Sequence, residues 1–224
     1  MKKIVFISDF FVDQIAGGGE ICDNVLMSLF RDDGYKIAKF NSHVTSDNHI
    51  KLYRKCGYKF IVSNFCNLHE QTKQELVKYP GSYSIMEHDH KYLRTRDPSV
   101  FKDFKAPSSQ IINRIFYANA KAIFAQSRLH KEVIEKNLGI SNVVNLGMNL
   151  WTDEQLAIIK SNLIAKLIQL QIMDVYQKTG LKNIKAKNSL SLLENKDKEF
   201  LAILKKRYIK KDFLLLVIQI LLLF

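Results

Sequence analysis

The sequence predicts an α/β fold in which helices flank a doubly wound, parallel β-sheet. Two observations indicate this fold. Short apolar runs, several of them rich in β-branched residues, recur as far as Trp151, and segments whose apolar residues have helical spacing lie between them. Strands that alternate with helices in this way form parallel sheets with right-handed crossovers.

The first strand is expected at residues 2–9, because an unbroken apolar run is typical of a buried parallel strand. AGGGE follows at residues 16–20, and the next helix is expected from Ile21 to a stop at Gly34. Further strands are expected at residues 35–40, 58–65, 81–87, 121–127 and 141–147, and further helices at 47–57, 69–79, 111–120 and 128–139.

The order of winding predicts where a ligand binds. In a doubly wound sheet, we expect the first strand beside the fourth, or beside whichever strand opens the second half. Ligands bind at the carboxyl ends of the strands where the winding reverses. The glycine segment after the first strand and the EHDH segment after the fourth, residues 87–90, should therefore face each other across one crevice.

The composition changes near Trp151, and we predict a first domain at residues 1–151 and an atypical, mostly helical extension at residues 152–224. All three prolines and eight of the nine glycines precede Trp151. The terminal run FLLLVIQILLLF is shorter than the roughly 20 residues that an ordinary transmembrane helix needs. It is therefore expected to be a buried element or a tail that contacts a membrane surface.

The net charge of +12 favours anionic ligands such as phosphates or acidic glycans, although it also fits a merely soluble basic protein. No nucleic-acid-binding module is recognisable, so we expect no nucleic acid. The three cysteines are widely spaced, which fits a reducing cytoplasm. Asp9 and Asp13 interrupt the apolar N-terminal segment, which we interpret as a strand rather than a signal peptide. The expected location is cytoplasmic, with the apolar tail allowing contact at the membrane periphery.

Three consecutive glycines, Gly17, Gly18 and Gly19, leave the loop after the first strand without side chains. The backbone can then approach a ligand and direct N–H groups at it, with phosphate the natural ligand, or it can be a flexible turn without one. The loop is not a dinucleotide fingerprint, because Cys22 stands where the third glycine is needed, and it lacks the Lys of a P-loop. Glu20 would be favourably placed near the positive end of the helix dipole.

The EHDH segment contains side chains that titrate or bind metals. If strand alternation continues through it, His88 and His90 lie on one side and Glu87 and Asp89 on the other. One histidine could act as a general base or anchor a hydroxyl group. Two histidines could also hold a metal, but no third ligand is evident, so we expect no metal site. The alternative is a set of exposed polar residues where the strand leaves the core.

Four other polar residues could contact a ligand or have a purely structural role. Lys91 and Arg94 could contact phosphate or simply solvate a loop. Ser127, at the end of the fifth strand, is either a helix N-cap, which we favour, or a ligand hydroxyl. His130, in the following helix, is expected on the helix surface rather than in catalysis.

An ordered set of motifs runs through residues 1–151. It begins with KIVFISDFF and AGGGE and continues with EHDHKYL, RDP, FKDFKAP, FYANAKAIFAQS, KNLGI and NLGMNLW. The set resembles the N-terminal half of a GT-B glycosyltransferase of the retaining family-4 type, whose first strand is followed by a Gly-Gly-x-Glu loop. The resemblance implies that residues 1–151 form one Rossmann-like half of such an enzyme.

The resemblance also implies a reaction and a site. The chain would transfer a sugar from a nucleotide-diphosphate sugar, its co-substrate, to a glycan or other acceptor, with no metal or cofactor. The N-terminal domain of this family mainly takes the acceptor. By position, the three glycines would line the donor diphosphate and His88 would contact the donor sugar, with His90 the second choice. The remaining candidates for phosphate or acceptor contacts are Glu20, Lys91, Arg94 and Ser127.

A GT-B enzyme has a second Rossmann-like domain that holds the nucleotide, and residues 152–224 are too few to supply it. We therefore expect a truncated or frame-shifted relative, or a chain completed by a partner that provides the donor-binding domain. The competing expectation is a non-catalytic acceptor- or phosphate-binding domain, or an inactive remnant. A nicotinamide-dependent oxidoreductase is disfavoured, because no acidic residue ends the second strand.

Overall fold

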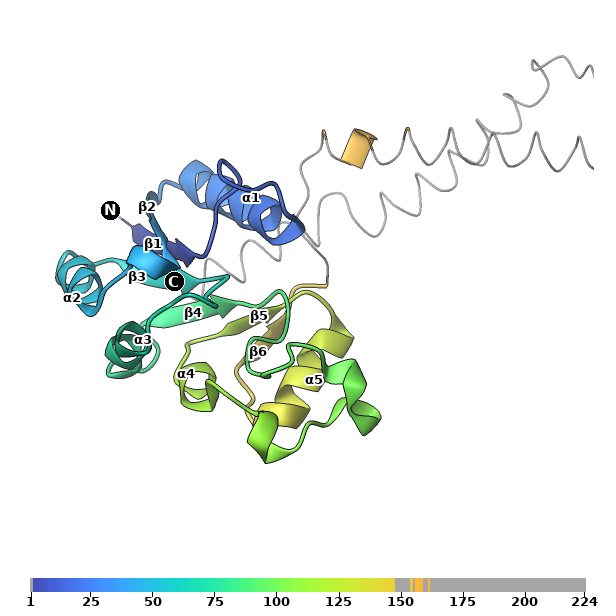
Figure 1. The fold of residues 1–224 in the computed structure, drawn as a ribbon. Helices are drawn as coiled ribbons and strands as arrows, with labels where there is room; N and C mark the ends of the chain where they lie inside the picture. Colours follow the sequence, from blue (N-terminus) through green and yellow to red (C-terminus); the bar gives the residue numbers. More distant parts are fainter. Residues whose placement is uncertain (1, 148–153, 155, 159–160, 162–224) are drawn as a thin grey trace, which may run out of the picture. The chain divides into compact units, whose positions relative to one another are not determined.

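A computed structural model of the chain describes residues 2–147, 154, 156–158 and 161. Within them, a six-stranded sheet has the order β2-β1-β3-β4-β5-β6, and all neighbouring strands are parallel (Figure 1). The strands are β1 (Lys3–Ser8), β2 (Lys36–Asn41), β3 (Lys59–Val62), β4 (Tyr83–Met86), β5 (Ile123–Ala125) and β6 (Val143–Asn145). The predicted α/β, Rossmann-like fold is confirmed.

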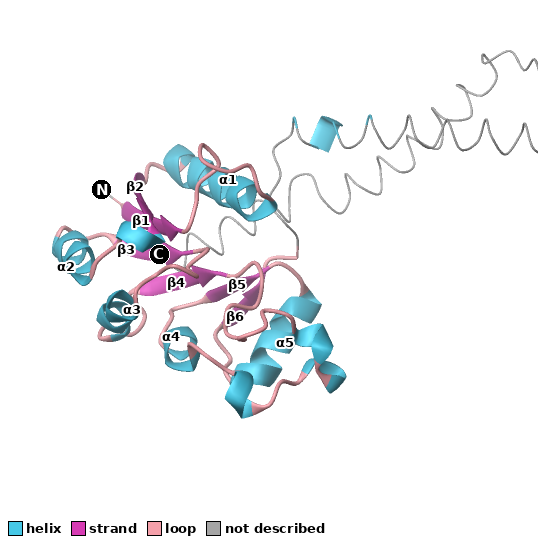
Figure 2. Ribbon diagram, in the orientation of Figure 1, coloured by secondary structure: helices cyan, strands magenta, loops and turns pink. Residues whose placement is uncertain are grey.

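The helices lie on both faces of the sheet, α1 on one face and α2, α3 and α4 on the other (Figures 1 and 2). Longer helices and short 3-10 turns connect the strands, and all of the strands predicted before Trp151 are present within one to three residues of the expected bounds. The helices are α1 (Gly18–Asp32), α2 (Asp47–Lys55), α3 (Glu70–Val77), α4 (Arg114–Ala118) and α5 (Arg128–Leu138); the 3-10 turns are η1 (Ser42–Val44), η2 (Pro98–Val100), η3 (Lys102–Phe104) and η4 (Ser108–Gln110).

β1 lies between β2 and β3, so the expected pairing of the first strand with the fourth is wrong, whereas the alternative, pairing with the strand that opens the second half, is confirmed by β3. After β2 the chain returns past β1 to form β3, and β4, β5 and β6 then follow outward in sequence order. The winding therefore reverses between β1 and β3. The carboxyl ends of these two strands form the switch point, and the end of β4 is the next along the edge.

Alternation along the strands supplies two apolar layers. Val5 and Ile7 of β1 belong to a large buried cluster that also contains residues of α2, α3, α4 and α5. Ile4 and Phe6, which are fully buried, point to the opposite face, where α1 lies. α1 presents an apolar stripe of Cys22, Val25, Leu26, Met27 and Phe30 to this face. Because both faces of the sheet are packed, the polar residues that follow its strands are held in fixed positions.

One helix is much shorter than expected. Residues 111–120 were predicted to be helical, but α4 begins only at Arg114 because Asn113 adopts a left-handed conformation with φ of 54°. Before this helix, Ile111 forms an isolated antiparallel bridge with Leu93, and the backbone N–H of Ile112 donates to the backbone carbonyl of Tyr92 at 2.8 Å. The apolar spacing of this segment therefore reflects packing on the core and not a continuous helix.

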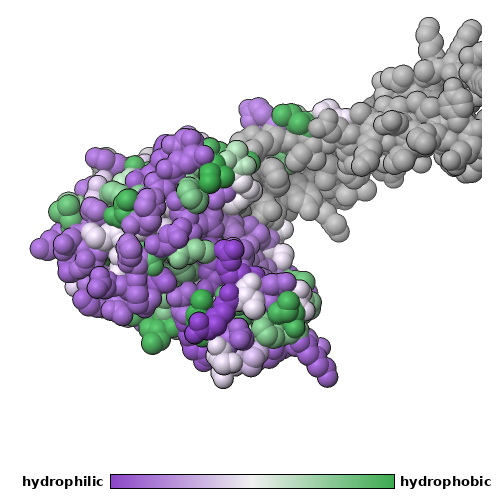
Figure 3. All heavy atoms as spheres, viewed as in Figure 1, coloured by the Kyte–Doolittle hydropathy of each residue, from purple (hydrophilic) through white to green (hydrophobic). Residues whose placement is uncertain are grey.

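The expected helical extension at residues 152–224 lies outside the described residues, apart from 154, 156–158 and 161. The terminal apolar run lies outside them as well. Among the described helices, none has the length and hydrophobicity to span a membrane. Hydrophilic residues predominate on the face shown in Figure 3, and hydrophobic residues occur there in small groups.

Candidate functional site at the carboxyl ends of the strands

The glycine loop and the segment after β4 meet at the carboxyl edge of the sheet. Gly17 is the N-cap of α1, and the helix begins at Gly18. A Cβ atom placed on Gly19 would lie 3.4 Å from Cδ2 of His88 and 3.1 Å from Nδ2 of Asn64, which follows β3. A side chain at position 19 would therefore require Asn64 to shift by a few tenths of an ångström, and the predicted proximity of the two segments is confirmed.

Glu20 closes one side of this glycine loop. Its Oε1 accepts a hydrogen bond from Nδ2 of Asn64 at 3.0 Å, and its Oε2 would overlap with a Cβ atom on Gly17. The carboxylate lies in the first turn of α1, where the helix dipole favours negative charge. Glu20 thus ties the loop after β1 to the loop after β3, and it places a negative charge beside the glycines.

His88 lies between two polar side chains from different elements. Its Nε2 donates to Oδ1 of Asp23 in α1 at 3.1 Å, and its Nδ1 accepts from the amide of Gln126, after β5, at 2.7 Å. The His88 side chain is only 8% exposed and that of Asp23 only 1%. These partners place a ring hydrogen on Nε2 and leave Nδ1 as the acceptor, since a carboxylate can only accept and an amide NH₂ can only donate.

Sequence reasoning missed Asp23, and a signal for it was present. Asp23 lies within the apolar stripe of α1, next to Cys22 and four residues before Met27, so a charged residue occupies a core-facing position. Its second oxygen, Oδ2, is buried without a hydrogen-bond partner among the described residues. Buried polar groups almost always have partners, so this oxygen is available to a ligand or a water molecule. Gln126 and Asn64 carried no comparable signal.

The predicted strand alternation through EHDH is wrong, because β4 ends at Met86 and His90 has a left-handed backbone with φ of 58°. Glu87 is fully buried and is not an exposed polar residue where the strand leaves the core. It accepts hydrogen bonds from the hydroxyl of Tyr117 and from the backbone N–H of Asp89, the latter at 3.0 Å. The four side chains consequently point to different neighbours.

Lys91 supplies the charge that compensates Glu87. Its Nζ lies 3.6 Å from Oε1 of Glu87 and forms a closer ion pair with Asp89, and its side chain is only 3% exposed. Burial raises the pKa of Glu87, but the Lys91 charge and the Tyr117 hydrogen bond outweigh it and leave the pKa below its usual value. Burial lowers the pKa of Lys91, but Glu87 and Asp89 outweigh it and leave that pKa raised.

A second pair of histidines lies beside this ion pair. The rings of His90 and His130 meet edge to face with centroids 4.5 Å apart, and Nδ1 of His90 contacts the hydroxyl of Tyr92 at 3.0 Å. His130 is 9% exposed, so its prediction as a helix-surface residue is wrong. Its Nδ1 accepts from the backbone N–H of Gln126 at 3.4 Å, whereas its Nε2 is buried with no partner in the described part of the chain.

Burial governs the ionisation of both histidines. It lowers the pKa of His90, although Glu87 and Asp89 partly oppose the shift. It lowers the pKa of His130 to about 4, and the neighbouring His90 acts in the same direction. Both rings are therefore neutral at neutral pH, which suits a hydrogen-bonding role and disfavours a role as a cationic phosphate ligand.

The other candidates from the sequence lie in several places. The Lys91 ammonium is buried and paired, so it does not solvate a loop, whereas Arg94 is exposed and its Nε donates to the carbonyl of Ser109 at 3.3 Å. Ser127 caps α5, since its hydroxyl accepts from the backbone N–H of His130 at 3.1 Å. The structure therefore gathers Glu20 and His88 at the glycine loop and leaves Arg94 outside that cluster.

Asp9, at the end of β1, organises the floor of this edge. Its carboxylate accepts from the hydroxyl of Ser42 and from the backbone N–H groups of Cys66 and Asn67, at 2.9 and 3.0 Å. Asp9 is buried, and it joins the segments that follow three strands. Its position explains why an acidic residue interrupts the apolar N-terminal segment.

Comparisons with known proteins do not assign the chain to a family. No model of a known protein family matches the chain, and no curated protein matches it. No group of three or more histidine, cysteine or acidic side chains within the described ranges is placed to hold a metal ion. The fold and the site define only a class: an α/β protein of Rossmann-like architecture with a glycine loop at its switch point and a largely buried histidine side chain after the next strand along the edge.

Proposed function

We propose that the chain is the acceptor-side half of a glycosyltransferase that moves a sugar from a nucleotide-diphosphate sugar to a glycan or similar acceptor. One observation carries the proposal. The glycine loop at the start of α1 follows β1 at the switch point of the sheet, where ligands of doubly wound proteins bind, and it lies against His88 after β4, the neighbour of β3. The motif resemblance supports the same reaction.

The glycine residues would bind the donor diphosphate through the backbone. Gly18 and Gly19 occupy the first turn of α1, whose N–H groups have no intrahelical partner and whose dipole favours anions. His88 would contact the donor sugar through Nδ1, since Nε2 is held by Asp23. A sugar hydroxyl would take the place of the Gln126 amide, which now donates to this nitrogen. His90, next to His130 and Tyr92, remains the second choice.

The charges around the loop make a partner necessary for donor binding. Glu20 and Asp23 lie beside the glycines and would repel a diphosphate, and Lys91 is occupied by two carboxylates. The cation that stabilises the leaving diphosphate would come from a second domain on a partner chain. The proposed location is the cytoplasm, with contact at a membrane surface where such acceptors are assembled.

The alternative is a non-catalytic acceptor- or phosphate-binding domain, or an inactive remnant of a transferase. The observation that favours it is the state of His88, whose two ring nitrogens are both satisfied by the protein and whose side chain is almost fully buried. In this case the glycine loop would bind an anion and no sugar would be transferred.

A titration with nucleotide-diphosphate sugars separates the two functions. The chain, purified alone and together with the partner chains that bind it, is titrated calorimetrically with each donor in a panel while release of nucleoside diphosphate is followed in the presence of glycan acceptors. Turnover that disappears in His88→Ala is the expected result for the transferase. The matched control is His43→Ala, because His43 is exposed and lies in η1, outside the site.

Two outcomes decide against the proposal. Binding without turnover, in the wild type and in mixtures with co-purifying partner chains, would favour the non-catalytic alternative. Equal turnover in His88→Ala and His43→Ala would remove His88 from the reaction. A Gly19→Ala variant tests the loop independently, because a methyl group at this position meets Asn64 and His88.

A further inference from the structure

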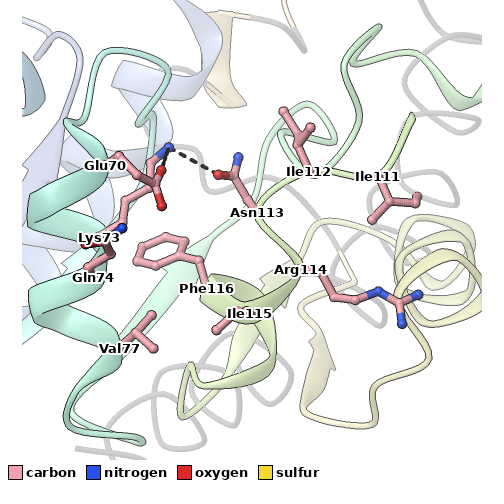
Figure 4. Close-up of a pocket in the computed structure, with 10 residues that line it drawn as sticks. All are labelled: Glu70, Lys73, Gln74, Val77, Ile111, Ile112, Asn113, Arg114, Ile115 and Phe116. Carbon is pink, nitrogen blue, oxygen red and sulfur yellow. Dashed lines mark hydrogen bonds and ion pairs between the residues drawn. The ribbon is translucent and has the colours of Figure 1, made fainter. Parts of the chain in front are cut away.

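A pocket of about 500 Å³ lies between α3 and the segment at residues 111–116, apart from the candidate site. Figure 4 shows side chains from both elements around it, with Lys73 of α3 facing Asn113 across its polar end. Pockets of roughly 300 to 1,000 Å³ with apolar walls and a few convergent polar groups are typical of small-molecule sites.

The wall is aliphatic and partly open. Val77, Ile111, Ile112 and Ile115 line it together with Phe116. Ile115 is 68% exposed, although it stands in a short helix whose next two residues are buried in the core. An isoleucine kept in solvent at the rim of a pocket is available to cover a hydrocarbon group, because burial of apolar surface is favourable.

The polar end contains a cation that the protein neutralises incompletely. The Lys73 side chain is only 13% exposed, yet its nearest carboxylate, Glu70 at 3.6 Å, is 69% exposed and beyond good hydrogen-bonding distance. The ammonium has three donors, and among the described residues one of them has an acceptor, Oδ1 of Asn113 at 3.1 Å. The ammonium also lies 5.8 Å from the ring centroid of Phe65, and its remaining donors are the ones that an anionic ligand in the pocket would use.

Asn113 holds this end rigidly. Its left-handed backbone is a conformation that asparagine adopts more readily than most residues, and its Nδ2 donates to the carbonyl of Lys91 at 2.9 Å. Both ends of the amide are therefore used, one on Lys73 and one on the segment after EHDH. The acceptor for Lys73 is built into the fold, and it connects the pocket to the loop that follows β4.

Arg114 adds a second cation at the margin of the pocket. Its guanidinium points away from Lys73, toward α5 (Figure 4), and its Nη2 donates to the carbonyl of Asn137 at 3.2 Å. The lining residues carry one formal net positive charge, from Lys73 and Arg114 against Glu70, and the contribution of Arg114 lies at the margin, directed away from Lys73. An anionic ligand is therefore favoured over a neutral or cationic one.

We propose that this pocket binds a small amphipathic anion, with a carboxylate or phosphate monoester head on Lys73 and an aliphatic chain along Val77, Ile111 and Ile115. The aliphatic wall selects the chain, and the incompletely neutralised ammonium selects the head. This inference goes beyond the transferase function and does not rest on it, since no lining residue belongs to the glycine loop or to EHDH.

The test is a titration of the full chain labelled with ¹³C at the isoleucine methyl groups. Decanoate and decyl phosphate are the two charged probes, and decanol is the uncharged one. We expect saturable shifts of the Ile111, Ile112 and Ile115 signals with a charged probe, and the arm with the tighter binding identifies the head group. The Lys73→Gln variant should bind that probe about tenfold more weakly than the wild type does, which is the usual effect of losing a charged hydrogen bond. The wild type should bind decanol more weakly than that probe by the same factor.

Two further variants complete the test. Lys102→Gln removes an exposed lysine outside the pocket and should leave the affinity unchanged. Ile115→Ser changes an exposed side chain that the fold does not need, so it tests the aliphatic wall even if Lys73→Gln is unstable, and it should weaken binding several-fold. Shifts that do not saturate, equal affinity for decanol and the charged probes, or unchanged affinity in both pocket variants would overturn the proposal.

Discussion

The imidazole of His88 donates through Nε2 to the buried carboxylate of Asp23, 3.1 Å away. The two residues lie 65 positions apart in the sequence, His88 shortly after β4 and Asp23 in α1. The contact fixes which ring nitrogen of His88 is free to accept a hydrogen bond. The second oxygen of Asp23 has no partner among the described residues, so its burial carries a desolvation cost. The arrangement directs Nδ1 of His88 toward Gln126.

Removing Asp23 should allow the imidazole of His88 to carry its hydrogen on either ring nitrogen. In Asp23→Ala, Nε2–H loses its acceptor, so the ring should become a mixture of tautomers, and the unsatisfied donor should cost about 1–3 kcal/mol of unfolding free energy. Long-range ¹H–¹⁵N spectra of the imidazole report the tautomer, and urea unfolding reports the stability. Asp23→Asn is the control, because its amide oxygen can still accept. An unchanged ring spectrum in Asp23→Ala would show that Asp23 does not set the tautomer.

Two neighbouring glycines should respond differently to alanine. A Cβ atom on Gly18 meets nothing within 4 Å, whereas one on Gly19 lies 3.1 Å from Asn64 Nδ2. Gly18→Ala should therefore stabilise the chain by a few tenths of a kcal/mol up to about 1 kcal/mol, because alanine loses less backbone entropy in a helix. Gly19→Ala should gain less, since Asn64 must shift away from Glu20.

The measurement is the unfolding free energy of both variants in wild-type and Asn64→Ala backgrounds. In the Asn64→Ala background the obstruction is reduced, so the difference between the two glycine positions should shrink. If Gly19→Ala is as stabilising as Gly18→Ala with Asn64 present, the close contact at position 19 is not a constraint in solution.

The fold could be predicted from the sequence because buried parallel strands have a strong local signal. Residues 4–7 form an unbroken apolar run within the strand expected at residues 2–9, and β1 lies there with these residues almost fully buried. The strand order could not be predicted in the same way, because both β3 and β4 follow the glycine-loop helix with similar apolar runs. Which of them pairs with β1 depends on the crossover after β2, which has no local signature.

The site was predicted in part for the same reason. Gly17–Gly19 and His88 follow strands, and residues that follow parallel strands gather at one edge whatever the strand order. Strand alternation failed at Glu87 because the strand ends one residue earlier, at Met86. Burial of His130 could not be read from its helix, because the neighbour that covers it, His90, comes from a loop with a left-handed backbone.

Loss of the Lys91 charge should be strongly destabilising. In Lys91→Met the buried carboxylate of Glu87 loses its compensating cation, and breaking a buried pair in this way costs about 3–5 kcal/mol. Glu87→Gln in the same background removes the stranded charge and should recover part of the loss. Urea unfolding of the two single variants and the double variant gives the coupling energy. A double variant that is as unstable as the sum of the single ones would show that the two charges do not interact.

The buried histidines should make the chain less stable in mild acid. The pKa of His130 is about 4 in the folded state, against an ordinary value of 6.5, so the unfolded chain binds a proton that the folded chain excludes. The stability that His130 contributes is therefore complete above pH 6.5 and is lost as the pH falls toward 4. Protonation would also remove Nδ1 as the acceptor for the Gln126 N–H.

The charged and titratable groups around His130 modify this dependence. His90 has a lowered pKa and acts in the same direction, while Glu87 favours the protonated ring and Lys91 and His88 oppose it. From the shift of His130 alone, the unfolding free energy should fall by about 2 kcal/mol between pH 7 and pH 5. Urea unfolding at the two pH values should give a smaller fall in His130→Gln, whereas exposed His43→Gln should match the wild type. If His130→Gln shows the same fall as the wild type, the imidazole of His130 is not the group that titrates.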